Sequence, residues 1–187
     1  MSQSTEQPLL PAGGSAPSLV ARLREETRPD HARVDAAFSR FDLTRRGGYA
    51  AFLTAQARVL PALEALLRPG ETIPGWHGRA ALLLQDLGQL GAAVPTAHAP
   101  DIQPGHAAWW GALYVMEGSR LGGAMLARRV PSHLPYAFLG ASQPPGAWRG
   151  ILARIDQACL SPSEQSASIE SAQAVFDAFE QAAYDQA

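Results

Sequence analysis

The spacing of the apolar residues is the feature that most restricts the fold of this chain. In most segments these residues recur every three or four positions, which places them on one face of an α-helix. No stretch of four to eight residues has the alternating, β-branched pattern of a strand. The sequence therefore predicts an all-α fold, a multi-helix bundle.

Capping residues, glycines and prolines set the expected helix boundaries. Pro61 lies inside the second predicted helix and should bend it near Ala57, because its ring crowds the carbonyl four residues before it. For the same reason, Pro29 should bend the first predicted helix just before His31. Residues 91–105 contain three prolines and are expected to form a loop. The predicted helices span residues 19–38, 49–67, 75–90, 106–129, 147–160 and 161–184.

Length and composition indicate one globular unit. A chain of 187 residues fits a single domain, which we expect over residues 18–187, after a disordered tail rich in Ser, Gln, Gly and Pro over residues 1–17. Cys159 is the sole cysteine, which excludes a disulfide or a multi-cysteine metal site within one chain. With no apparent signal peptide, a reducing, cytoplasmic setting is the simplest expectation.

The charge balance restricts the class of partner. The chain has 15 basic and 17 acidic residues, a net charge of −2, which argues against broad binding to nucleic acid or to a membrane surface. All the basic residues are Arg, so lysine chemistry is excluded and any carboxylate held by charge must be held by Arg. The most apolar stretch, 109–130, is interrupted by Glu117, Arg120 and Arg128 and is a poor membrane span.

His31 lies on an apolar face of the first predicted helix. At about 100° per residue, Arg24, Thr27 and His31 share the stripe expected to face the core. Asp35, one turn further on, is placed to accept a hydrogen bond from the imidazole, as carboxylates do beside metal-ligating histidines. The face is compatible with an iron ligand or with a core histidine whose hydrogen bonds are satisfied.

A glycine-rich stretch dominates the helix predicted at 106–129. Glycine costs about 1 kcal/mol relative to alanine at each helical position, so four of them require compensation. Gly111, Gly118 and Gly122 lie on one face, at positions i, i+7 and i+11, and Gly123 follows directly. A face without Cβ atoms admits either a neighbouring helix or a planar ligand, and the pattern alone leaves both readings open.

Two segments resemble those of the haem oxygenase family. Residues 23–35 are similar to the family's proximal helix, and residues 114–123 are similar to its distal helix. The resemblance extends from about residue 18 to the end and is closest to the bacterial branch that supplies biliverdin to bacteriophytochromes. The two motifs read Leu-Arg-Glu-Glu-Thr-Arg-Pro-Asp-His-Ala-Arg-Val-Asp and Tyr-Val-Met-Glu-Gly-Ser-Arg-Leu-Gly-Gly.

The resemblance implies haem as both substrate and cofactor, sandwiched between these two helices. It implies His31 as the proximal iron ligand and Arg24 facing a propionate, with Gly118 and Gly122 against the distal face. The implied activity is oxidative cleavage of haem to biliverdin, carbon monoxide and ferrous iron, with O2 and electrons from an external ferredoxin or reductase. The implied haem-binding residues are Arg24, Thr27, Asp35, Gly118, Gly122, Gly123 and Arg149; the implied catalytic residues are Gly118, Ser119 and Gly122.

The sequence departs from the family pattern at two places. Many members carry an Asp where this chain has Ser119, whose hydroxyl can hold a water but cannot be an anionic acceptor. The basic residues before the last helix are also altered, with Arg149 the best substitute and Arg154 a weaker one. A haem carrier or sensor without turnover, and a helical bundle without haem, remain the alternatives to an enzyme.

Overall fold

The computed structural model describes residues 17–141, 143–158 and 160–185, and these contain helices and loops but no strand. The prediction of an all-α fold is confirmed. The predicted disordered tail and Cys159 lie almost wholly outside the described residues. The α-helices are α1 (Leu19–Glu26), α2 (Arg28–Phe38), α3 (Arg46–Ala57), α4 (Leu60–Leu67), α5 (Ala80–Gln89), α6 (His106–Leu126), α7 (Ala137–Gly140), α8 (Ala147–Gln157) and α9 (Pro162–Tyr184).

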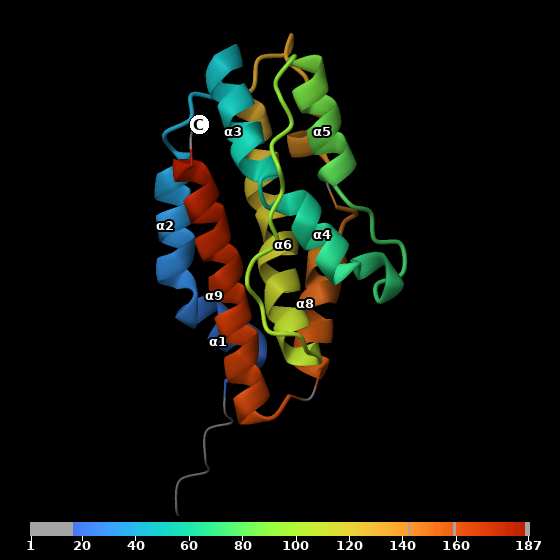
Figure 1. Ribbon diagram of the computed structural model, residues 1–187. Helices are drawn as coiled ribbons and strands as arrows, with labels where there is room; N and C mark the ends of the chain where they lie inside the picture. Colours follow the sequence, from blue (N-terminus) through green and yellow to red (C-terminus); the bar gives the residue numbers. More distant parts are fainter. Residues whose placement is uncertain (1–16, 142, 159, 186–187) are drawn as a thin grey trace, which may run out of the picture.

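Two long helices, α6 and α9, form the centre of the molecule (Figure 1). The start of α9 follows from its sequence, because the Ser161 hydroxyl accepts from the Glu164 N–H while the Glu164 carboxylate accepts from Ser161. Helices α1, α2 and α3 also pack on α9, and α7 and α8 pack on α6. Val175 and Ala172 on the inner face of α9 are fully buried.

The expectation of one helix over 19–38 is wrong in one respect, since the chain forms α1 and α2 with a break at Thr27. Pro29 is the physical reason: it has no N–H to donate, and its ring crowds the preceding turn. The Thr27 hydroxyl instead donates to the Leu23 carbonyl at 2.7 Å. The bend predicted just before His31 is therefore present, and it sets the direction of α2.

The helix predicted over 49–67 is likewise divided, into α3 and α4, with the break at Arg58 and Val59 just before Pro61. The proline-rich loop lies against this break, where the His98 N–H donates to the Arg58 carbonyl at 2.7 Å. By length and composition, Arg46–Glu71 is apolar enough to cross a membrane, but the structure divides it into two α-helices and the short 3-10 helix Pro69–Glu71. About 44% of its most apolar window is buried inside the fold.

The structure corrects two further boundaries. Helix α5 begins at Ala80 rather than near residue 75, and the Glu64 carboxylate accepts from the N–H groups of Arg79 and Ala80 at 2.7 and 3.1 Å. Helix α8 ends at Gln157 rather than at 160. The four-residue helix α7 was not predicted, because its start depends on a side chain about fifty positions away.

That side chain is Asp86, which is fully buried and accepts from the N–H groups of Ala137 and Phe138 at 3.2 and 2.9 Å. Replacing Asp86 with alanine would leave both donors without a partner, and the Phe138 N–H is buried. We expect a loss of about 1–3 kcal/mol in the free energy of unfolding, measured by urea denaturation. Asp86→Asn keeps one acceptor oxygen and should lose less. Equal stability of the wild type and Asp86→Ala would contradict this assignment.

Candidate functional site

A cavity of about 500 Å³ opens between α2, α6 and α9. This volume lies within the range of small-molecule pockets, about 300–1,000 Å³. Its walls are mostly apolar, and α3, α7 and α8 complete them. The aromatic residues that line it are Phe38, Phe52, Tyr114, Phe138, Trp148, Phe176 and Phe179.

His31 lies on the α2 wall of this cavity. Its Nδ1 is 3.1 Å from Asp35 Oδ2, and its ring meets the edge of Phe176 at a centroid distance of 5.8 Å. With a proton on Nδ1, toward Asp35, a neutral imidazole has its lone pair on Nε2, and Nε2 has no hydrogen-bond partner among the described residues. The pairing with Asp35 that the i+4 spacing predicts is present.

The core-facing position expected for His31 needs correction, because 64% of its side chain is exposed. Val20 and Thr27 on the same stripe are buried, whereas Arg24 and His31 are exposed. Arg24 and His31 are exposed because this part of the stripe borders an open cavity and is not closely packed. His31 thus faces a space large enough for a ligand.

Arg24 and Tyr114 lie together on the lining of the cavity. Burial raises the pKa of the Tyr114 hydroxyl, while the positive charge of Arg24 acts in the opposite direction. The phenol therefore stays protonated at neutral pH and can donate. Thr27 also lines the cavity, but its hydroxyl hydrogen is used by the Leu23 carbonyl. Arg24 and Tyr114 together offer a cation and a hydroxyl donor to a carboxylate. Sequence reasoning had assigned no role to Tyr114.

The two ends of the glycine face differ: one packs against a helix, and the other lines the cavity. Gly111 serves helix packing: a Cβ there would overlap the Ser168 carbonyl of α9. Gly118, Gly122 and Gly123 line the cavity, and Gly122 has open space where a Cβ would lie. A Cβ on Gly118 would lie 3.4 Å from the Trp148 ring. The three glycines therefore leave part of the α6 wall as bare backbone, between the side chains of Tyr114, Val115, Leu121 and Leu126.

Ser119 lies beside these glycines and also lines the cavity. Its hydroxyl donates to the Met116 carbonyl at 2.7 Å and accepts from Arg79 Nη2 at 2.7 Å. The single hydroxyl hydrogen is thus used by the backbone, so Ser119 is oriented as an acceptor toward any further partner.

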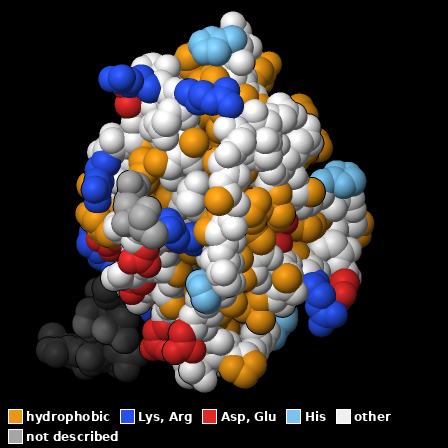
Figure 2. Space-filling model, turned by 45° about the horizontal axis from the view of Figure 1, so that its top comes forward, with side chains coloured by type: hydrophobic (Ala, Val, Ile, Leu, Met, Phe, Trp, Pro, Cys, Tyr) orange, Lys and Arg blue, Asp and Glu red, His pale blue; other side chains and the backbone are white. Residues whose placement is uncertain are grey.

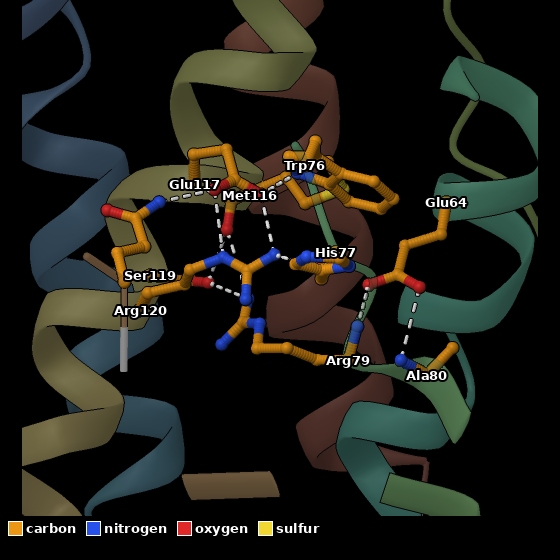
Figure 3. A network of polar contacts seen from close by, with 10 residues as sticks. Glu64, Trp76, His77, Arg79, Ala80, Met116, Glu117, Ser119 and Arg120 are labelled. Atoms are coloured by element: carbon orange, nitrogen blue, oxygen red, sulfur yellow. Dashed lines mark hydrogen bonds and ion pairs between the residues drawn. The ribbon is translucent and has the colours of Figure 1, made fainter. Parts of the chain in front are cut away.

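Arg79, which precedes α5, was missed by sequence reasoning although it lines the cavity and is only 3% exposed. It is part of a polar network that joins the segment before α5 to α6 (Figure 3). This network, which we call the network behind α6, also contains Glu117 and Arg120. Glu117 is 1% exposed, pairs with Arg120 through both carboxylate oxygens, and accepts from Trp76 Nε1 at 2.8 Å. Nothing in the local sequence around Arg79 indicates this burial, since its partners come from another helix.

Arg149 does not join the site. It is exposed on α8 and does not line the cavity, and Arg154 is exposed on the same helix. Trp148 lines the cavity instead, so the sequence expectation was one residue away from the side chain that turns inward. The structure brings together the other predicted residues: Arg24, Thr27, His31, Asp35, Gly118, Ser119, Gly122 and Gly123.

Charged side chains do not gather into a single-sign patch on the face drawn in Figure 2, where Arg and Asp or Glu side chains are interspersed among apolar and uncharged atoms. Fold and cavity thus define a helical ligand-binding protein, with an imidazole on one wall and glycine backbone on the other.

Comparisons with known proteins agree with this description. Over 113 residues the chain is 38% identical to a protein of Xanthomonas campestris pv. campestris (strain 8004) named "Heme oxygenase", and the match covers 56% of this chain and 68% of that protein. No family model matches. At this identity and coverage, the chain belongs to the haem oxygenase family.

Solved structures share the fold. The heme oxygenase of Neisseria meningitidis, determined with bound NO and CO, gives a TM-score of 0.78 at 22% identity and covers 91% of this chain and 92% of its own. Heme oxygenase from Leptospira interrogans gives a TM-score of 0.68 at 20% identity and covers 90% and 100%. The expected family fold is thus confirmed, although the particular bacterial branch stays a prediction.

Proposed function

We propose that this protein binds haem in the cavity between α2 and α6 and cleaves it to biliverdin, carbon monoxide and ferrous iron, using O2 and external electrons. The observation that carries the proposal is the pairing of His31 on one wall with the glycine backbone of α6 on the other. A flat macrocycle fits such a slot, and membership of the haem oxygenase family supports turnover over passive carriage. The working unit is the domain over residues 18–187.

His31 is proposed as the iron ligand. The Nδ1–Asp35 contact fixes which ring nitrogen carries the proton and leaves Nε2 as the donor to the metal. The edge contact with Phe176 restricts rotation of the ring. Gly118, Gly122 and Gly123 are proposed to cover the opposite face, where the missing side chains leave space for O2.

Arg24 and Tyr114 are proposed to hold a haem propionate, since they place a cation and a phenol donor at the cavity. Arg24→Leu removes a charge-assisted contact and should weaken haem binding about 10-fold or more. The measurement is a titration with haemin followed at the Soret band. Arg128→Leu removes one charge from an exposed residue outside the cavity and should bind haem like the wild type. Wild-type affinity in Arg24→Leu would contradict the assignment.

Partners and setting are further parts of the proposal. The reaction needs electrons, for which a ferredoxin or a reductase is the proposed donor. The proposed setting is the cytoplasm, and the proposed recipient of biliverdin is a bacteriophytochrome.

The proposed activity is tested by adding haem and a reductant, with catalase present to remove stray peroxide. An enzyme loses its Soret band while a biliverdin band grows. A carrier or sensor keeps its Soret band under the same conditions, and a helical bundle without a haem site shows no Soret shift on titration with haemin. Either of the last two results would defeat the proposed activity.

A further inference from the structure

Arg79 is a buried cation at the α6 wall of the cavity. Nη2 donates to the Met116 carbonyl at 3.0 Å and to Ser119 Oγ at 2.7 Å. Nε is buried without a hydrogen-bond partner, and Nη1 makes no hydrogen bond to any other residue in the described ranges. The guanidinium lies 5.2 Å from the centre of the Phe138 ring, which also lines the cavity. Part of its hydrogen-bonding capacity is therefore unused.

No carboxylate neutralises this guanidinium within the part of the chain that the structure describes. Glu117 pairs with Arg120 instead, and its remaining capacity is taken by Trp76 and Gln143 (Figure 3). Glu64 is also used elsewhere, since its two oxygens accept the backbone N–H groups at the start of α5. The network behind α6 thus places two guanidinium groups beside one buried carboxylate.

The charge on Arg79 persists at neutral pH. Burial, followed by the positive charge of Arg120, lowers its pKa to about 10, while Glu117 and Glu64 act in the opposite direction. A buried cation without a counter-ion is unfavourable, and an incoming anion offsets that cost. Ser119 cannot supply this charge, because it is neutral and its hydrogen is used by Met116.

We propose that Arg79 makes the α6 side of the cavity a site for small anions, so that negative charge on a ligand opposite His31 is stabilised by this guanidinium. The inference rests on the proposed binding of haem. The guanidinium lies beside the neutral hydroxyl of Ser119, so the α6 wall presents a fixed cation.

The test uses the ferric haem complex and two anionic probes, fluoride and azide. Arg79→Met should bind both about 10- to 100-fold more weakly, the range for the loss of a hydrogen bond to a charged group. Arg79→Lys, which keeps the charge, should stay within a few-fold of the wild type. Neutral imidazole serves as the ligand control, and its affinity should change little in either variant. Arg128→Met makes the same chemical change at an exposed residue outside the cavity, so it controls for the loss of one positive charge from the protein as a whole.

Arg79→Gln keeps donors for Met116 and Ser119 while removing the charge, so it replaces Arg79→Met if that variant does not fold. Wild-type affinity for both anions in a folded, neutral variant would overturn the inference. An equal loss of fluoride, azide and imidazole would also overturn it, because access and not charge would then be affected. Failure of the proposed function is seen separately, as the absence of a Soret shift in the wild type.

Discussion

Replacing His31 with alanine is expected to reduce haem turnover by more than about 100-fold while leaving the fold intact. The change removes the one imidazole that lines the cavity, and with it the proposed metal ligand. Stability should change by less than about 0.5 kcal/mol, because 64% of the side chain is exposed and truncation there leaves no buried gap. Single-turnover loss of the Soret band and urea denaturation measure the two effects.

Two companion experiments separate ligation from packing. Free imidazole added to His31→Ala should restore the ferric spectrum, since it can enter the space that the side chain leaves. Asp35→Asn keeps the ligand but weakens its orientation, and by analogy with residues behind other metal ligands it should lower haem affinity about 10- to 100-fold. Undiminished turnover in His31→Ala, or an unchanged ferric spectrum, would show that the iron is held elsewhere.

Replacing Gly111 with alanine is expected to destabilise the protein by about 3 kcal/mol or more. The added Cβ would overlap the Ser168 carbonyl, which is backbone of α9 and cannot rotate away. Relief requires the two central helices to separate, and overpacking of this kind costs 1–3 kcal/mol even where side chains can adjust. Because whole domains are stable by only about 5–15 kcal/mol, this is a large fraction of the total.

Gly122→Ala is the matched control, with the same chemical change eleven residues along the same helix. A Cβ at this position meets open space. The alanine should therefore stabilise α6 by up to about 1 kcal/mol through its helix propensity. Urea denaturation of both variants compares them directly. If the two unfold at the same urea concentration, the close approach of α6 and α9 at Gly111 is not what requires glycine.

Much of the fold follows from local chemistry. The start of α9 was predicted from Ser161 and Pro162, and the structure shows a capping box there between Ser161 and Glu164. The bend before His31 was predicted from Pro29 alone, although the position of the break at Thr27 was not. Helix α7 escaped prediction because Asp86, distant in sequence, supplies the cap.

The candidate site was likewise predictable only where its contacts are local in sequence. His31 and Asp35 are one turn apart, so their contact was predictable from helical geometry. Arg149 lies outside the lining of the cavity, because the sequence does not reveal which side of α8 turns toward it. Arg79 was missed because its partners Met116 and Ser119 lie 37 and 40 positions away, and no local pattern marks it as buried.

By itself, the sequence determined the helical class, the ends of several helices and the two surfaces proposed to enclose the substrate, because periodicity, capping and i to i+4 contacts act within one helix. Only the tertiary structure decided which glycine packs a helix and which faces the cavity, and where the unneutralised cation lies. Those properties depend on the side chains of other helices, whose approach is set by packing over the whole core.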